Sequence, residues 1–402
     1  METNKSYKVK LYPTIKQSKQ IDLTINHCRF IYNKFLEDRI TAYQEFKGRP
    51  ELLKKVKYKT TKQLRDVFPF LKDVSFNALD AKRLDVEAAY RNFFRTKKGF
   101  PKFKSRHRSK LSYKHLTAGK LTDNNKINLP LIGSINFRGL AEEYQGNLKQ
   151  ITVVKNKDNT YEAVLMVERE EIHKERKYNN ILGIDLGIKS FITCSNGEQI
   201  DITNTNKIEN KIKQAQKHLS RKEKGSNRYE KQRIKVARLH TKRTNIQKHF
   251  FDHLVNKLCS ENQTIYLEDL NVKGMVKNRK LSRAISNQSW CKFVSTLTLK
   301  SREYNTKVVK IDRFYPSSKM CSRCGNINKE LKLSDRAYKC KCGLEIDRDL
   351  NAAINIKNFD IIKSSEIGDY RRGEKVRLFK LQFSNSGSKF YEASNTNMKM
   401  EV

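Results

Sequence analysis

The sequence lacks any apolar run long enough to cross a membrane. Its richest apolar stretch, Ala163 to Val167, has the length of a β-strand, whereas a spanning helix needs about 18 apolar residues. The opening segment METNKSYKVKLYP also lacks the apolar core that is typical of a secretory signal. We therefore expect a cytoplasmic protein that is not secreted and has no membrane partner.

Acidic residues are scarce relative to basic ones. The 402 residues include 84 Lys and Arg but only 43 Asp and Glu, which gives a formal net charge of +41. A chain with this surplus repels itself unless an acidic partner neutralises it, and nucleic-acid backbones are the usual partner. Hydrophobic residues make up 37% of the chain, enough for a folded core, so wholesale disorder is not expected. The length allows two or three domains.

The first hundred residues predict a short strand followed by a helical module. Residues 7–11 have the character of a strand, and Thr14 can cap the helix that follows. Apolar residues spaced three or four apart then define two helical faces. The first face comprises Ile21, Ile25, Cys28, Tyr32 and Phe35, and the second, in a helix over 75–94, comprises Leu79, Ala81, Leu84, Ala88 and Phe93.

The segment KKGFPKFKSRHRSK, residues 97–110, is rich in positive charge and contains no acid. Its basic side chains can contact phosphates while its two phenylalanines pack or stack on bases. A solvated loop that the same two phenylalanines anchor is the alternative interpretation. The candidate nucleic-acid contacts in this segment are Lys97, Lys98, Lys102, Lys104 and Arg106.

The remaining chain predicts a β-rich segment, a linker and a second, mixed domain. Residues 111–170 show strand alternation, and the charged stretch 168–177 is a candidate linker. Strands and helices then alternate, with strongly basic helices over 207–248 that break near 225–227. The polar stretch after Phe359 has little periodicity and predicts a poorly ordered tail.

Three acidic residues stand where acids are unusual. Asp185 lies between two glycines in an apolar strand, Glu268 ends a second apolar strand, and Asp349 stands at the start of a helix. If both strands lie in one sheet on which the helix packs, the three carboxylates converge. Clustered carboxylates ionise together only beside a cation, and hard oxygen ligands suit Mg²⁺ or Mn²⁺. Two such ions about 3.5–4 Å apart can drive phosphodiester hydrolysis.

Each acid taken alone has another interpretation. Asp347 can replace Asp349 as the functional acid, and Asp269 can replace Glu268. Acids at the ends of strands and helices also often serve as helix caps or surface charges. The pattern alone leaves these alternatives open.

Four of the eight cysteines lie close together, as Cys321-x-x-Cys324 and Cys340-x-Cys342. A glycine follows each pair and allows the tight turn that directs backbone amides at sulfur. Four thiolates satisfy tetrahedral Zn²⁺ with no open position, so we expect a structural zinc ribbon in a reducing compartment. The second pair is C-x-C rather than the usual C-x-x-C, which weakens the assignment of Cys340. Four free thiols in a loop are the alternative.

Four motifs together resemble the TnpB family of transposon-encoded RNA-guided DNA nucleases, which is related to type V CRISPR effectors. They are GIDLGIKSF at 183–191, YLEDLNVKGM at 266–275, FYPSSKMCSRCG at 314–325 and CGLEIDRDLNAAINI at 342–356. The N-terminal segments KLYPTIKQSKQI, CRFIYNKFL and GFPKFKSR are similar to that family as well. The resemblance extends in order over residues 5–358.

The resemblance implies an α+β multidomain fold. An N-terminal β-barrel-like wedge domain with an inserted helical recognition domain would precede a C-terminal RuvC-like α/β nuclease domain of the RNase H type, which contains a zinc ribbon. The implied boundaries are a first wedge strand at 1–13, the recognition domain at 14–110, the wedge β domain at 111–178, the nuclease domain at 179–312, the ribbon at 313–345, the end of the nuclease domain at 346–358 and a disordered tail at 359–402.

The resemblance also implies roles and partners. Asp185, Glu268 and Asp349 match the three carboxylates that bind catalytic Mg²⁺ or Mn²⁺, and the four clustered cysteines match the ligands of structural zinc. The implied activity is cleavage of double-stranded DNA next to a short motif, at a site that pairs with guide RNA from the transposon end. This would take place in a prokaryotic, nucleoid-associated setting, and no small-molecule substrate is expected.

Asn77, Lys82 and Arg83, on the second predicted helix, are candidates for reading the adjacent motif, with solvated helix residues as the alternative. Three other functions would each account for part of this sequence pattern. A nuclease-inactive relative would bind guided DNA as a repressor, and a transposase would use the same acids for strand transfer. A zinc-ribbon protein without activity would leave Asp185 and Glu268 unexplained.

Overall fold

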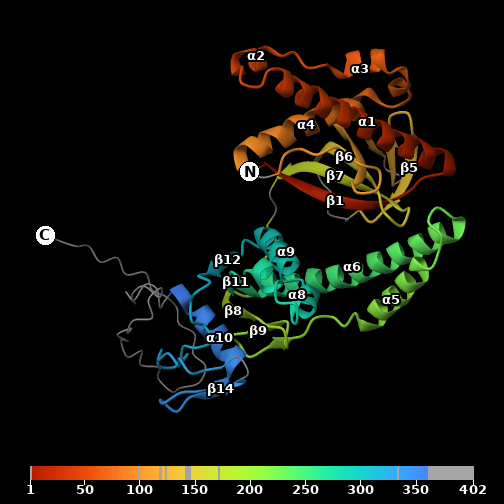
Figure 1. Ribbon diagram of the computed structural model, residues 1–402. Helices are drawn as coiled ribbons and strands as arrows, with labels where there is room; N and C mark the ends of the chain where they lie inside the picture. The colour runs from red at the N-terminus through yellow and green to blue at the C-terminus, as the bar shows by residue number, and fades with distance from the viewer. Residues whose placement is uncertain are drawn as a thin grey trace. The chain divides into compact units, whose positions relative to one another are not determined.

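The computed structural model describes residues 2–97, 99–116, 120–122, 125–140, 146–170, 173–332 and 335–360. These residues form two compact units, whose elements are labelled in Figure 1. Unit 1 comprises Met1–Ile172 together with Thr205–Ile246, and unit 2 comprises His173–Asn204 and the chain from Gln247 onward. Lys98 and the predicted tail beyond Asp360 lie outside the described residues.

Unit 1 is built on a seven-stranded antiparallel sheet with the order β2-β6-β7-β1-β5-β4-β3. Its strands are β1 (Glu2–Tyr12), β2 (Leu111–Leu116), β3 (Lys120–Thr122), β4 (Lys126–Leu129), β5 (Gly133–Arg138), β6 (Asn147–Lys155) and β7 (Tyr161–Glu170). Alternate residues of β7, among them Ala163 and Leu165, are buried, as the two-residue period of a strand with one buried face requires. The predicted strands at 7–11 and within 111–170 are confirmed. β1 lies between strands that follow it by more than a hundred residues.

The N-terminal helices of unit 1 are α1 (Ile15–Glu45), α2 (Pro50–Lys55), α3 (Thr61–Val67) and α4 (Phe76–Thr96), together with the 3₁₀-helix η1 (Pro69–Asp73). α1 and α4 pack against each other (Figure 1). Both also pack against β2. As predicted, Thr14 caps α1, because its hydroxyl accepts a hydrogen bond from the backbone amide of Gln17. The side chain of Gln17 bonds back to the amide of Thr14 and completes a capping box. All five residues predicted for the apolar face of α1 are buried.

The buried face of α4 differs from the predicted one. Leu79 and Ala81 are buried as expected, whereas Leu84 and Phe93 are half-buried and Ala88 is exposed. Core positions are occupied instead by residues such as Val86 and Lys82. The buried Lys82 is compensated by Asp85, whose Oδ2 lies 2.8 Å from its ammonium nitrogen. Apolar spacing misplaced the face because a charged residue lies on it.

A helical hairpin from the second half of the chain also belongs to unit 1. α5 (Asn206–Ser220) and α6 (Asn227–Glu261) are separated at the predicted break. Arg233 of α6 donates a hydrogen bond of 2.7 Å to the carbonyl oxygen of Lys157 in the β6–β7 turn. The sequence-based division placed this hairpin in the nuclease domain. The structure groups residues 205–246 with unit 1, and α6 continues into unit 2.

Unit 2 contains a five-stranded mixed sheet with the order β10-β9-β8-β11-β12. Its strands are β8 (Asn180–Leu186), β9 (Ile192–Cys194), β10 (Gln199–Ile200), β11 (Asn262–Glu268) and β12 (Lys307–Ile311), accompanied by α7 (Val272–Met275), α8 (Ser282–Gln288), α9 (Trp290–Glu303), the hairpin β13 (Ala337–Lys339) and β14 (Glu345–Asp347), and α10 (Arg348–Lys357). β8, β11 and β12 are parallel, and β9 and β10 are antiparallel additions. Buried residues of α6 and α9, among them Phe251 and Trp290, share the core with the sheet. Within the described part of the chain, no helix has both the length and the apolar character that crossing a membrane requires.

Helix α10 packs directly on β8 at Gly183. A Cβ atom there would lie 2.1 Å from the carbonyl oxygen of Ala353 and 2.5 Å from the amide nitrogen of Lys357. We expect Gly183→Ala to lower the free energy of unfolding by about 3 kcal/mol, measured in urea, because backbone atoms of α10 must move. Gly197→Ala is the control. A Cβ at Gly197 meets nothing within 4 Å, so only its φ of +90° should cost about 1 kcal/mol. Equal losses would contradict the close packing.

Buried His115 makes the stability of unit 1 depend on pH. Its ring lies 5.2 Å from that of Tyr113, and neither ring nitrogen has a hydrogen-bond partner among the described residues. Burial lowers the pKa of His115 to about 4, whereas an exposed histidine has a pKa of about 6.5. Between these values the unfolded chain binds a proton that the folded chain does not. This contribution to stability is therefore complete above pH ~6.5 and is lost as the pH falls toward 4.

His115→Phe removes this titration. Between pH 7 and pH 5, we expect the parent to lose about 2 kcal/mol of unfolding free energy more than the variant does. Urea unfolding at the two pH values measures the difference. If the parent and His115→Phe lose stability in parallel, His115 is not a neutral buried histidine.

Candidate carboxylate site and cysteine cluster

Three acidic residues of unit 2 come together through the topology of the sheet. Asp185 lies on β8, and Glu268 ends the neighbouring parallel strand β11, whose Leu267 pairs with Ile184. Asp349 lies in the first turn of α10, the helix that packs on β8. Parallel neighbours end at the same edge of a sheet, where open α/β sheets place their functional residues. The structure thus brings together all three acids predicted from the sequence.

The three carboxylates interact electrostatically. Burial raises the pKa of Asp185 well above its usual range, and the negative charges of Glu268 and Asp349 raise it further. Burial also raises the pKa of Glu268, while a hydrogen bond from Ser317 lowers it. The guanidinium of Arg348 lies 3.2 Å from Oδ1 of Asp349 and lowers the pKa of Asp185. Repulsion among the acids exceeds this compensation, so the site favours an additional positive charge.

The two neighbouring acids have other partners. Asp347 is the N-cap of α10, and its carboxylate accepts hydrogen bonds of 2.9 and 3.0 Å from two backbone amides of the first turn. Asp269 forms ion pairs with two basic side chains at the end of β12, and its side chain is 46% exposed. These contacts favour Asp349 and Glu268 as the members of the site.

The donor set suits a hard divalent cation. Carboxylate oxygens are the ligands that Mg²⁺ and Mn²⁺ prefer, and a cation between the acids relieves the repulsion that raises the pKa of Asp185. In the described ranges, only the four clustered cysteines bring three or more ligand atoms within 4.8 Å of one another. The carboxylates are therefore spaced more widely than one compact ligand set.

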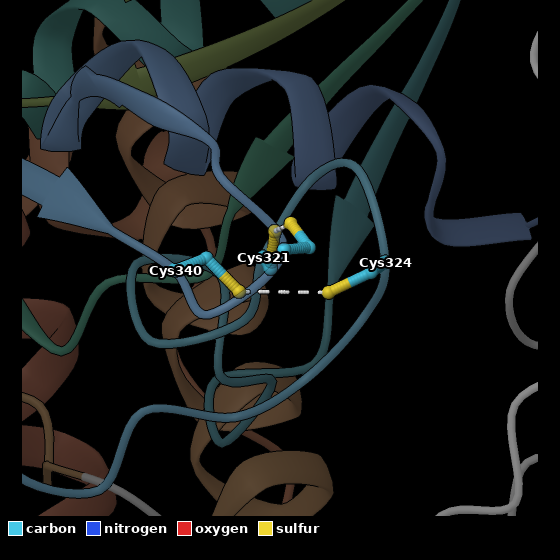
Figure 2. A group of neighbouring side chains, drawn as sticks. Cys321, Cys324 and Cys340 are labelled. Atoms are coloured by element: carbon cyan, nitrogen blue, oxygen red, sulfur yellow. Dashed lines mark hydrogen bonds between the residues drawn. The ribbon is translucent and has the colours of Figure 1, made fainter.

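The cysteines predicted as zinc ligands form a compact cluster (Figure 2). The distance between sulfurs is 3.6 Å for Cys321 and Cys342 and 3.5 Å for Cys324 and Cys340. A tetrahedral zinc ion with Zn–S bonds of about 2.3 Å separates its ligand sulfurs by about 3.8 Å. The four residues therefore fit a zinc ion, and Cys340 of the shortened second pair fits with them.

The two glycines that follow the cysteine pairs supply the predicted turns. Gly325 and Gly343 have φ angles of 70° and 84°, in the left-handed region that glycine adopts without strain. A hydrogen bond from the backbone amide of Leu344 is the main cause that lowers the pKa of Cys342 to about 7. Burial raises the pKa of Cys321 to about 12, so this ligand needs the cation itself to become a thiolate.

The three candidate motif-reading residues on α4 make contacts within unit 1. The side-chain amide of Asn77 forms two hydrogen bonds of 2.8 Å with the backbone of Leu116. Lys82 is buried beside Asp85, and Arg83 pairs with two acids of the same helix. These contacts join α4 to β2 and order its surface. A role in reading bases stays a prediction.

The basic segment that follows α4 divides into exposed and half-buried members. The exposed members are Lys97, Lys102 and Arg106. Lys104 is half-buried, with its ammonium 3.6 Å from the centroid of the Tyr32 ring, and its backbone forms two hydrogen bonds with the side chain of Asn33. Burial lowers the pKa of Lys104 to about 8. Lys104 therefore attaches the segment to α1 and leaves its exposed cations directed to solvent.

A groove of about 1080 Å³ in unit 1 combines Arg106, a predicted nucleic-acid contact, with basic residues that the sequence did not identify as contacts. It lies between α1, the segment around Arg106, the β6–β7 turn and the α5–α6 hairpin. Its charged lining comprises Arg106, Lys155, Lys157, Lys224 and Arg233, with the acids Asp22 and Glu230. These residues come from separate parts of the chain, so no local pattern identifies them as a group. The available signals were the predicted basic segment that contains Arg106 and the surplus of basic residues over 207–248.

Comparisons with known proteins match segments that contain both sites. The family models described as "Probable transposase", "Cas12f1-like, TNB domain" and "Helix-turn-helix domain" match residues 164–279, 290–356 and 1–48. The last region contains β1 and the single long helix α1. In a cryo-EM structure of a Cas12f1–sgRNA–target DNA complex, the matching chain has a TM-score of 0.55 at 13% identity, covering 89% of this chain and 99% of that chain. The two proteins therefore share a multidomain α+β fold.

Two curated relatives span most of the chain. A protein of Streptomyces pristinaespiralis with the name "Putative RNA-guided DNA endonuclease" is 32% identical over 358 residues, which cover 88% of this chain and 89% of the relative. InsQ of Escherichia coli K12, which has the same designation, is 27% identical over 380 residues, which cover 89% and 92%. Identity of this extent along both proteins shows that the chain belongs to the TnpB family of RNA-guided DNA endonucleases.

Proposed function

We propose that this chain cuts double-stranded DNA next to a short motif, at a site selected by a guide RNA, through hydrolysis at Asp185, Glu268 and Asp349. The observation that carries the proposal is the convergence of these carboxylates at the end of β8 and β11. Three parallel strands extended by two antiparallel ones agree with a RuvC-like domain of the RNase H type. In this proposal residues 313–345 form the zinc ribbon, held by the four clustered cysteines.

Each residue of the site has its own role in this proposal. Asp185 supplies a carboxylate from the rigid centre of the sheet, Glu268 supplies one that Ser317 orients, and Asp349 supplies one from α10. Mg²⁺ or Mn²⁺ ions, when bound, would activate water and stabilise the leaving oxygen. Arg348 adds a positive charge at the same edge, where it can contact a phosphate oxygen of the DNA.

Unit 1 supplies the nucleic-acid contacts in this proposal. Its sheet corresponds to the wedge domain and α1 to α4 to the recognition domain. The net charge of +41, the exposed cations after α4 and the basic groove offer phosphate contacts along a backbone. RNA–DNA pairing can then select the target sequence, so the protein itself needs to read only the short adjacent motif.

Co-purification tests the proposal. The protein is isolated from cells that express its gene with the flanking DNA, and the bound RNA is sequenced. We expect one defined RNA, together with cutting of DNA that matches its 3′ end, dependent on Mg²⁺ and stopped by EDTA. Guided binding without cutting would favour a nuclease-inactive repressor. Absence of any specific RNA would favour a transposase or a general nucleic-acid binder.

A further inference from the structure

Residues 315–322 connect β12 to the cysteine cluster and lie against the carboxylate site. Within this segment Ser317 is buried, and its hydroxyl donates a hydrogen bond of 2.5 Å to Oε1 of Glu268. A hydroxyl that donates to a carboxylate forms one of the stronger hydrogen bonds found in proteins. Ser317 therefore restricts the rotation of the Glu268 carboxylate and leaves its second oxygen directed elsewhere.

Two buried asparagines of α10 hold the same segment. The side-chain amide of Asn355 donates hydrogen bonds of 2.7 and 2.6 Å to the carbonyl oxygens of Ser317 and Met320. Asn351 donates to the carbonyl oxygen of Met320 at 2.7 Å and accepts a hydrogen bond from the amide of Ser322 at 2.9 Å. Both asparagines are at most 1% exposed, so breaking these bonds would leave buried polar groups unpaired.

These hydrogen bonds connect α10, which carries Asp349, to the segment that contains Ser317 and to the cysteine cluster. Asp349 lies on α10 two residues before Asn351, and Cys321 lies between the two residues that Asn351 contacts. One rigid helix therefore presents one carboxylate directly and fixes the segment that orients another. A shift of this segment along α10 would move Ser317 and, through its hydroxyl, the carboxylate of Glu268.

We propose that Ser317 is a positioning residue of the nuclease site. It holds the Glu268 carboxylate in the orientation that a divalent cation requires, and Asn351 and Asn355 set its position relative to Asp349. The inference rests on the proposed function in one respect, that Glu268 is a cation ligand. Groups that orient a ligating carboxylate typically contribute about 10- to 100-fold to metal affinity or activity.

Ser317→Ala in the full-length protein with its RNA tests this role. We expect cleavage at saturating target DNA to slow by about tenfold or more, and the Mg²⁺ concentration for half-maximal cleavage to rise about tenfold. The Kd for target DNA and the zinc content should match the parent. Ser318→Ala, one residue along, is the matched control and should change none of these quantities. Ser317→Thr keeps the hydroxyl and should recover most of the lost rate.

Each outcome of these measurements supports or overturns the positioning role of Ser317. Unchanged cleavage and Mg²⁺ dependence in Ser317→Ala would overturn the proposal, as would a folded Ser317→Thr protein that stays equally slow. Loss of zinc from Ser317→Ala would also overturn it, because the hydroxyl would then serve the folding of the cysteine cluster. A parent protein that shows no Mg²⁺-dependent cutting contradicts the nuclease function itself. If the parent cuts and Ser317→Ala cuts at the same rate, only the proposed role of Ser317 is contradicted.

Discussion

Asp185→Ala is expected to slow Mg²⁺-dependent DNA cleavage at least about a thousandfold, while guided DNA binding changes less than about twofold. Asp185 is the acid on which both other carboxylates act, so its removal takes a ligand from the centre of the set. Metal ions stabilise developing charge by several kcal/mol, and about 1.4 kcal/mol corresponds to a tenfold change in rate. Single-turnover cleavage and a DNA-binding titration on the same preparation measure the two quantities.

The same substitution should leave folding intact. Burial and two neighbouring acids hold the pKa of Asp185 above its value in the unfolded chain, so the ionised side chain destabilises the fold at neutral pH without a cation. In buffer without added divalent cations, the variant should therefore melt at the same temperature as the parent or above it. Asp269→Ala, which removes an exposed acid paired with Lys310 and Arg313, is the control and should cut within about twofold of the parent. Lost RNA or DNA binding in Asp185→Ala would show that the acid is structural.

Cys324→Ser is expected to remove the zinc and to destabilise unit 2. Structural zinc in isolated finger peptides contributes about 10–16 kcal/mol of apparent folding free energy, and the fold fails without it. Unit 2 has a separate core formed by its sheet, α6 and α9, so we expect only part of this loss, about 3 kcal/mol. A loss of that size lowers the melting temperature by roughly 6–12 °C in a domain of this length. Metal analysis and thermal unfolding measure both effects.

A second cysteine provides the control for this experiment. Cys291 is an exposed thiol on α9 and lies outside the cluster. Cys291→Ser should therefore keep the zinc content and the melting temperature of the parent. An unchanged zinc content in Cys324→Ser would contradict the assignment of the four cysteines as zinc ligands. Loss of zinc from both variants would point to general damage and not to a specific ligand.

Local patterns predicted the features that depend on neighbours in the chain. The apolar spacing of α1 identified five buried positions because a helix on a sheet needs a continuous apolar stripe. Thr14 and the two cysteine pairs were recognisable for a similar reason, since a capping box and a sulfur knuckle each lie within a few residues. For the acids, residue type and strand context sufficed to suggest convergence.

Other features were not predictable in this way, because they depend on a choice between neighbouring residues or on contacts between distant segments. The choice between Asp347 and Asp349 depends on which acid caps α10, and sequence alone allowed both. Lys82 was a candidate for reading bases, but its side chain is buried and pairs with Asp85 three residues along. The bond between Ser317 and Glu268 spans 49 residues, and no periodicity marks it. The basic groove likewise depends on packing of the α5–α6 hairpin in unit 1.

The order of the three acids along the chain has a consequence for protein synthesis. Asp349 follows Asp185 by 164 residues. Ribosomes add about 5–20 residues per second, so α10 is made roughly 8–33 s after β8. During that interval the nascent chain contains the strands of unit 1 and Asp185. It does not yet contain Asp349 or α10, the helix that holds Ser317 in place. If the proposed function holds, each new molecule can meet its RNA before it is able to cut, because translation adds the third carboxylate well after the other two.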